Sequence, residues 1–259
     1  MRIEKNEFKS RNVGNGYGYV TRIEKTNSNQ EMFVMNKERP SAIMLSADSV
    51  TEGSHTLVLI NNDEKGGMTG RLQASPGFDE ASGMRQRIKE KGREEFMKKL
   101  QTTYSGDAIL SNLQIDSLNQ PEQPLGVNYD FRLTPDSSSD LYYFNPMMAE
   151  GYKENPFKSA ERVYPVEMPY AMDETYTMNM EVPAGYEVDE LPKSAKVLFN
   201  SDEGFFEYLI AKSDRTIQFR SRIKLKKANF KPEDYSTLRD FFAYIVKKQS
   251  EQIVFKKKK

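Results

Sequence analysis

Two-residue alternation of apolar and polar side chains is the feature that most constrains how this chain can fold. Residues 127–133, "VNYDFRL", place four apolar side chains on one side of an extended chain and three polar ones on the other. The same period recurs in "TYTMNMEV" (175–182) and "TIQFRSRIKL" (216–225). Successive side chains of a strand point to opposite faces, so each segment is predicted to be a strand with one buried and one solvated face. Such strands are typical of antiparallel sheets.

Six further apolar segments between turn-forming residues also predict strands. They are 55–61, 68–74, 109–115, 195–200, 205–211 and 252–256. Glycine-containing turns at 61–67 and 201–204 are expected to join two pairs of them as hairpins, because glycine readily takes positive φ.

Two segments have the apolar spacing of helices instead. Residues 79–101 carry a narrow apolar stripe interrupted by Gly92, and residues 232–249 begin with Pro232 at a position suited to a first helical turn. With strands in the majority, we expect a mainly β fold: an antiparallel, jelly-roll-like β-sandwich with two helices packed at its edges.

The domain organisation predicted from these patterns has two parts. Residues 1–50 are expected to form a loosely structured N-terminal segment, and residues 51–259 to form the β-sandwich domain. Prolines, serines and charges displace the apolar pattern after residue 134, so the second part is read either as one unit or as two lobes divided near 135–155.

Composition excludes several classes of function. Lys plus Arg equals Asp plus Glu, at 38 each, so no net positive charge favours nucleic acid or an anionic membrane surface. No apolar run reaches the ~18 residues of a transmembrane helix. The chain has no cysteine, and therefore no disulfide, thiolate zinc site or cysteine nucleophile. The first residues, "MRIEKNEFKS", lack the apolar core of a signal peptide.

Motifs that suggest catalysis or cofactor binding do not meet the requirements of those functions. The glycine-rich run 14–20 is not followed by a helical pattern, as a phosphate-binding loop requires. His55, the single histidine, lies in a predicted strand with no nucleophile elbow. The run 61–66 resembles a calcium loop but has Lys65 at a ligand position and Leu72 where the closing glutamate belongs.

Other polar and aromatic clusters are interpreted as structural. Adjacent acids at 173–174, 189–190 and 233–234 could do acid–base chemistry, but such pairs are expected in a chain with 38 acidic residues. Aromatic runs at 142–144 and 205–208 could stack a ligand, although the second alternates as a core strand does. Basic residues in 85–93 alternate with glutamates, which indicates a solvated helix surface.

A family resemblance supplies context. The segments "NPFKSAERVYPVEMPY" (155–170) and "NFKPEDYSTLRDFFAYIVKKQSEQIVFKK" (229–257), with weaker similarity back to residue 53, resemble the C-terminal β domain of unknown function in secreted Gram-negative bacterial proteins. In that family, a transglutaminase-like core with a cysteine, a histidine and an aspartate precedes this domain. The resemblance implies that such a core would lie before residue 1. No position here matches its three catalytic residues.

The resemblance implies a non-catalytic structural or accessory β domain that packs against an upstream transglutaminase-like domain, in the periplasm or at the cell surface. The alternative is a cell-surface module that binds a glycan or a peptide. We expect no enzyme activity and no nucleic-acid partner, and we assign no catalytic, cofactor-binding or metal-binding residue. The proline-rich stretch 154–170 is predicted to be an extended crossover, because proline cannot donate to a sheet. Phe157, Val163, Tyr164 and Val166 are expected to anchor it.

Overall fold

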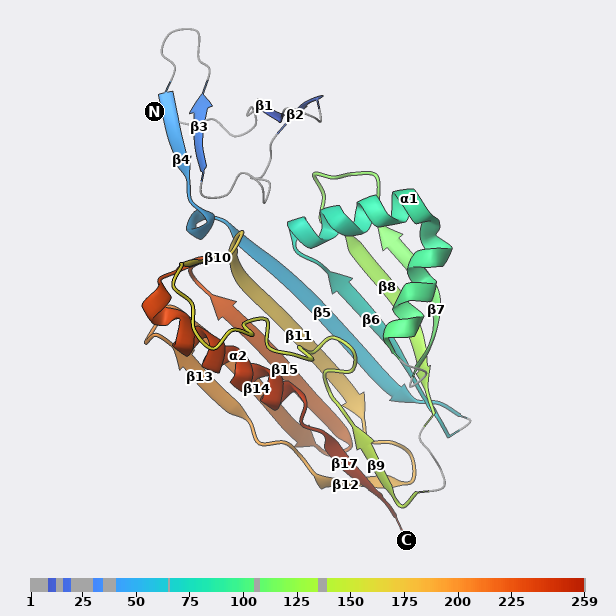
Figure 1. The fold of residues 1–259 in the computed structure, drawn as a ribbon. Helices are drawn as coiled ribbons and strands as arrows, with labels where there is room; N and C mark the ends of the chain where they lie inside the picture. The colour runs from blue at the N-terminus through green and yellow to red at the C-terminus, as the bar shows by residue number, and fades with distance from the viewer. Residues whose placement is uncertain are drawn as a thin grey trace.

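The computed structural model describes residues 9–12, 16–19, 30–34, 41–64, 66–104, 108–134 and 139–258. Its largest element is an eight-stranded sheet in the order β13-β14-β15-β11-β5-β6-β8-β7 (Figure 1). The strands of this sheet are β5 (Thr51–Asn62), β6 (Met68–Ser75), β7 (Ala108–Asp116), β8 (Gly126–Leu133), β11 (Ala171–Glu181), β13 (Ala195–Phe199), β14 (Gly204–Ser213) and β15 (Thr216–Leu225).

Four smaller sheets accompany it. A three-stranded sheet has the order β12-β17-β9, and three two-stranded sheets pair β1 with β2, β3 with β4, and β10 with β16. The bounds are β1 (Lys9–Asn12), β2 (Gly16–Tyr19), β3 (Gln30–Val34), β4 (Ser41–Leu45), β9 (Leu141–Phe144), β10 (Val166–Glu167), β12 (Tyr186–Glu190), β16 (Asn229–Phe230) and β17 (Ile253–Lys257).

The helices lie close to where the sequence predicts them. Helix α1 spans Phe78–Thr103, α2 spans Tyr235–Gln249, and the short 3-10 helices η2 (Ala47–Ser49) and η3 (Pro232–Asp234) precede β5 and α2. Gly92 has φ 88° and ψ 167°, which divides α1 into two segments and gives the bend seen in Figure 1. Among the described residues no helix is long and apolar enough to cross a membrane.

The predicted mainly β fold with two packed helices is confirmed, and two details differ from the predicted sandwich. Strands β5 and β11, at the centre of the large sheet, run parallel, whereas every other neighbouring pair in it is antiparallel. A two-residue period is common to both orientations, so alternation could not reveal the parallel pair. The second layer is built from α1, α2 and the small β12-β17-β9 sheet (Figure 1).

The core lies on one face of the large sheet. In β11, for example, Tyr176, Met178 and Met180 are buried, whereas the residues between them are partly exposed. We call this the covered face and the opposite one the open face. The open face carries salt bridges such as Arg222–Asp173, with Nε to Oδ1 at 2.8 Å. It also carries exposed apolar residues, including Leu209 and Leu198.

The crossover 154–170 is anchored at fewer points than predicted. Phe157 packs edge-on against Phe242 of α2, with ring centroids 5.2 Å apart, and Val166 is buried in β10. Val163 and Tyr164 are 81% and 75% exposed, so the prediction that they anchor the segment was wrong. They lie between the two attachment points, where no described element covers them.

Two predictions about domain organisation are not tested by the fold. Residues 1–50 contribute strands β1 to β4, but the loose structure predicted for the whole segment stays a prediction. The predicted division near 135–155 begins at residues 135–138, which lie outside the described residues.

Candidate functional site

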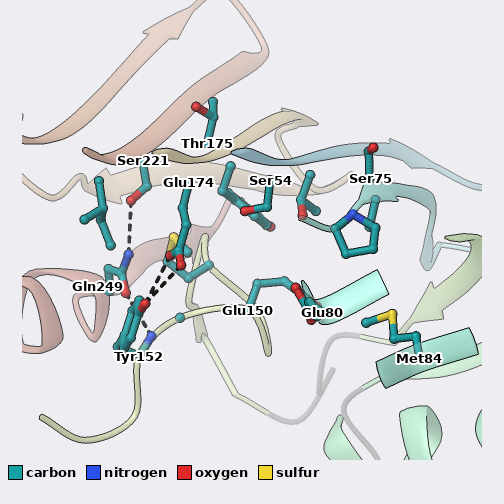
Figure 2. Close-up of a pocket in the computed structure, with 17 residues that line it drawn as sticks. Ser54, Ser75, Glu80, Met84, Glu150, Tyr152, Glu174, Thr175, Ser221 and Gln249 are labelled. Atoms are coloured by element: carbon teal, nitrogen blue, oxygen red, sulfur yellow. Dashed lines mark hydrogen bonds between the residues drawn. The ribbon is translucent and has the colours of Figure 1, made fainter. Parts of the chain in front are cut away.

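A cavity of about 340 Å³ lies between the covered face of the large sheet and the layer above it (Figure 2). Its floor comes from β5, β11 and β15, and its walls from α1, the end of α2 and the loop after β9. The lining residues are Ser54, Thr56, Ala74, Ser75, Pro76, Glu80, Met84, Met147, Glu150, Gly151, Tyr152, Glu174, Thr175, Tyr176, Ser221, Ile223 and Gln249.

Strand register brings polar side chains together on the floor. In the parallel pair, Glu174 is the partner of Ser54 and Tyr176 is the partner of Thr56. In the antiparallel pair on the other side of β11, Tyr176 is the partner of Ser221. Residues paired across neighbouring strands point to the same face. Three adjacent strands therefore place hydroxyl and carboxyl groups at one level of a face that is otherwise apolar.

Hydrogen bonds tie the floor to the wall near α2. The Tyr152 hydroxyl donates to both carboxyl oxygens of Glu174, each at 3.2 Å. The backbone N–H of Tyr152 donates to Oε1 of Gln249 at 2.9 Å, and Nε2 of Gln249 donates to the Ser221 hydroxyl at 3.1 Å. Figure 2 shows these bonds as one connected set. Glu174 and Tyr152 are thus held in place by residues far apart in the sequence.

A second acid lies at the other end of the cavity. One carboxyl oxygen of Glu150 accepts a hydrogen bond of 3.3 Å from Tyr104, whose hydroxyl is 2.7 Å from that of Tyr129. Glu150 as a whole residue is exposed, because the cavity is open to solvent. Its carboxyl group, however, is surrounded by protein on most sides. Glu80, from the first turns of α1, lies beside Glu150 in the cavity lining (Figure 2).

The acids of the cavity hold their protons more tightly than free carboxyl groups. Burial is the main cause that raises the pKa of Glu174 to about 7; the hydrogen bond from Tyr152 opposes the shift and the charge of nearby Glu80 adds to it. Burial also raises the pKa of Glu150, against the hydrogen bond from Tyr104. Partial burial raises the pKa of Glu80, and Arg87 opposes it. Raised carboxyl pKa values in a cavity are a recognised mark of functional sites.

Tyr176 adds a polar group without a partner. It is 5% exposed, and its hydroxyl makes no hydrogen bond with the described residues. Burial, followed by the charge of Glu150, raises its pKa, so the hydroxyl is neutral. An unsatisfied buried hydroxyl costs about 1–3 kcal/mol unless water or a ligand bonds to it. Among the described residues, no group of three or more histidine and acidic side chains is placed to hold a metal ion.

The adjacent acids Asp173 and Glu174 are separated by the sheet. Asp173 points to the open face, where Arg222 and Lys224 bind its carboxyl oxygens at 2.8 and 3.0 Å. The hydrogen bond from Arg222 holds the pKa of Asp173 below its usual value, against the effect of burial. The pair is therefore not a catalytic couple, although Glu174 by itself is a candidate acid or base.

His55 lies in a shallow hollow on the open face, which Ser75 and Asp116 also line. His55 and Ser75 are partners across the β5–β6 pair, but β6 and β8 lie between β5 and the Asp116 strand. Three interstrand spacings of about 4.8 Å put Asp116 roughly 14 Å from His55. Asp116 instead accepts a hydrogen bond from Asn128 at 2.8 Å. The three residues do not form a catalytic triad.

Several other candidate motifs have structural roles. Asp63, in the calcium-like run, accepts a hydrogen bond from the Gly67 backbone and pairs with Arg132. Arg85, in the basic stretch of α1, donates to three backbone carbonyls of the 117–123 loop. The glycine-rich run 14–20 lies partly outside the described residues, and its residues 16–19 form β2.

The remaining acidic pairs and aromatic runs do not line the cavity. Residues 189–190 lie exposed on β12, and residues 233–234 belong to η3, ahead of α2. Phe206 and Tyr208 are fully buried on the covered face. Tyr142 stacks on Phe255, with ring centroids 5.9 Å apart. Tyr143, which faces the other way, is exposed.

Comparisons with known proteins show similarity over part of the chain. Residues 140–255 match the model of a family described as a Domain of Unknown Function with solved structure, DUF3858. A solved structure from Parabacteroides distasonis, described as a "putative protease", is 18% identical with a TM-score of 0.38; the match covers 45% of this chain and 23% of that chain. A likeness this weak supports no argument about activity. No curated protein matches this chain.

Sequence reasoning missed the acidic cavity. One signal was available for Glu174, because it shares the alternation phase of Tyr176, Met178 and Met180 and so belongs on the buried face. Glu80 and Glu150 had no such signal. They come from a charged helix and a loop, and only the tertiary fold brings them to the cavity.

Proposed function

We propose that this chain is a non-catalytic accessory β domain of a larger protein that also carries a transglutaminase-like domain. The support is the resemblance of residues 53–257 to the C-terminal region of such proteins, together with the match of residues 140–255 to a domain family of unknown function. We also propose a periplasmic or cell-surface location, on the same resemblance.

The observation that carries the non-catalytic part is the setting of His55. Acyl transfer of the transglutaminase type needs a thiolate, a base in hydrogen-bond reach of it and a group that orients the base. The chain contains no thiol. His55 lies on β5 at the open face of the sheet, and strands β6 and β8 separate it from Asp116 on β7. A serine-based variant would need an exposed nucleophile on a sharp turn, whereas Ser75 is the last residue of a strand.

An assay of glutamine turnover tests this part. The purified chain is incubated with a glutamine-containing donor peptide and a primary amine, and ammonia release is measured against an active transglutaminase. We expect no release above background, and identical behaviour of wild type and His55→Ala. Release by the wild type that disappears in His55→Ala would overturn the non-catalytic proposal.

The open face is the surface that we propose packs against the upstream domain. It is the side of the large sheet that no described helix or strand covers, and it carries the exposed apolar side chains Ile109, Leu198 and Leu209 among paired charges. The test is binding to the separately expressed upstream domain, measured by calorimetry. We expect Leu209→Asp to weaken the complex and Gln218→Asp, an exposed polar position on the same face, to leave it intact. Equal affinity of both variants would refute this choice of surface.

The alternative is a cell-surface module that binds a glycan or a peptide, and one observation favours a binding role. The covered face holds an open cavity with acidic and tyrosine side chains, which a purely structural domain does not require. A glycan or peptide array probed with wild type and Tyr152→Phe separates this role from the accessory one. Specific retention of wild type alone would support the alternative.

A further inference from the structure

The two edges of the large sheet differ in how they are protected from pairing with another strand. Strand β13 ends the strand order, and among the described residues no hydrogen bond reaches the side of its backbone that faces away from β14 (Figure 1). The opposite edge, β7, has a bulge between Ser111 and Gln114, where Asn112 takes φ 53°. A bulge keeps an edge from pairing with a further strand. The β13–β14 register has no such shift, so the β13 edge is open to a further strand.

The lysine of β13 does not protect this edge. Lysines on edge strands commonly prevent pairing, because a further strand would crowd their charge. Lys196 instead bonds to Glu207 on β14 at 2.8 Å, and its ammonium group lies 5.3 Å from the centre of the Phe205 ring on the same strand. Its charge is therefore held over the sheet, away from the outer side of β13.

Apolar side chains border the β13 edge on both faces of the sheet. On the open face, Leu198 is 60% exposed. On the covered face, Val197 is partly buried, and its partner on β14 is Phe206. Tyr244 of α2 lies edge-on to Phe206, with ring centroids 6.2 Å apart, and is itself exposed. A strand added beside β13 would cover both Leu198 and Tyr244.

The flank of α2 that carries Tyr244 has charges of both signs, one on either side of the tyrosine. The other flank of the helix faces the crossover, where Arg239 donates to the backbone carbonyl of Ala160 at 2.9 Å. Asp240, Tyr244 and Lys247 follow one another at spacings of four and three, which puts them on one side of the helix. Asp240 has only a loose ion pair with Arg239, at 3.7 Å, and Lys247 is exposed with no ion-pair partner among the described residues. This flank is complementary in charge to a second copy of itself that runs the opposite way.

We propose that two copies of this chain pair through β13, antiparallel and centred on Val197, so that the large sheet continues from one copy into the other. A two-fold axis at Val197 also passes close to Tyr244, because both lie at the level of Phe206. The axis sets Asp240 of each copy opposite Lys247 of the other, as a self-complementary interface requires. It also sets Leu198 beside the aliphatic stem of Lys196 from the other copy. The inference does not rest on the accessory role, and most of the open face stays free for the packing proposed above.

The position of α2 fits this arrangement. Phe241 packs against Phe199 of β13, and Tyr244 packs against Phe206 of β14. The helix therefore lies above the boundary between these strands, one interstrand spacing from the two-fold axis. With a spacing of about 4.8 Å, the two copies of α2 lie about 10 Å apart, at the upper end of the range of about 8–10 Å for packed helices. The helix contact enlarges an interface that a five-residue strand alone would leave small.

Sedimentation velocity over a range of concentrations tests the proposal. At about 100 μM, wild type should form a reversible dimer with twice the 29.9 kDa mass of the chain. Leu198→Asp should stay monomeric, because it places an unpaired charge in the strand pair. Ile109→Asp is the matched control, since it makes the same kind of change on the opposite edge at a residue that is 65% exposed, and it should dimerise like wild type. Wild type that stays monomeric would overturn the proposal and leave the β13 edge to a strand of a different protein.

Charge reversal on α2 tests the two-fold arrangement. Asp240→Lys and Lys247→Asp each bring like charges together at two symmetric places, so each should weaken the dimer by about 10-fold. The double variant restores opposite charges and should recover most of the wild-type affinity. Both sites are exposed, so circular dichroism should be unchanged in all three. Unchanged affinity in the single variants, or no recovery in the double variant, would overturn the arrangement.

Hydrogen exchange shows whether the contact is on the strand. Backbone amides within residues 195–199 of wild type should exchange more slowly at about 100 μM than at about 1 μM, because pairing protects them. Leu198→Asp should exchange at the same rate at both concentrations. Protection that appears in β7 and not in β13 would assign the dimer to the other edge and overturn the proposal.

Discussion

The packing of α2 makes a quantitative prediction about Phe242. Its side chain is 2% exposed and lies edge-on to three aromatic rings, with centroids 5.7 Å from Tyr152, 5.2 Å from Phe157 and 5.9 Å from Phe241. Truncating a buried phenylalanine to alanine costs about 3–5 kcal/mol, from lost burial and the cavity left behind. Edge-on aromatic pairs add about 0.5–1.5 kcal/mol each. We therefore expect Phe242→Ala to lower the free energy of unfolding by an amount in the upper half of the range of about 3–5 kcal/mol.

Urea denaturation followed by circular dichroism measures this cost. For a chain of this size, about 4 kcal/mol corresponds to a fall in Tm of roughly 8–16 °C. Tyr164→Ala is the control, because it also removes an aromatic ring but from a site that is 75% exposed. It should change the free energy of unfolding by no more than about 0.5 kcal/mol. The assigned packing would be refuted if Phe242→Ala lowered the free energy of unfolding by less than about 1 kcal/mol, or if Tyr164→Ala lowered it as much as Phe242→Ala does.

Two further predictions concern the adjacent acids of β11, measured by urea denaturation at several pH values. The pKa of Glu174 in the folded state is raised to about 7, so wild type loses stability as pH rises from about 4.5 to 7. Glu174→Gln removes the group that titrates, and the variant should be more stable than wild type by on the order of 1–2 kcal/mol at about pH 8.5. A destabilised Glu174→Gln at that pH would contradict the assigned burial. The pKa of Asp173 is lowered, so its effect on stability has the opposite pH dependence. Asp173→Asn should lower the free energy of unfolding by about 1 kcal/mol at neutral pH, and this difference from wild type should vanish as pH falls through the pKa of Asp173.

The alternation of apolar and polar side chains predicted the strands well, because burying one face of a strand imposes this pattern on the residues of the strand itself. The strand predicted at 127–133 is β8, and the one predicted at 216–225 has the bounds of β15. The parallel pairing of β5 with β11 was not predictable in this way, because it depends on the chain crossing back over the sheet after β6, α1, β7, β8 and β9. Exposure of Val163 and Tyr164 was also missed, since residue type alone does not show whether a crossover touches the sheet at every apolar position.

The candidate site was harder to predict because its parts have different origins. Glu174 could have been found from its phase in β11, yet its neighbour Asp173 made the two look like a chance pair of acids. From the sequence alone, Glu80 belongs to a helix with a solvated surface and Glu150 belongs to a loop. Their meeting with Glu174 depends on how α1 and the loop after β9 pack over the sheet.

The polar row across the covered face is the reason to regard the cavity as more than a packing defect. On β5, β11 and β15 the inward positions are apolar at one end of each strand, as at Val58, Met178 and Phe219. At the level of the cavity the inward positions become Thr56, Tyr176 and Ser221, which are partners across the three strands, with Ser54 and Glu174 paired beside them. A packing defect would leave an apolar void, because random loss of volume does not replace three in-register side chains with polar ones. Local rules of core formation are typically broken where function requires it. The breach here is shared by three adjacent strands, so Glu174 and the neighbouring hydroxyl groups are held as one polar surface by the strand register.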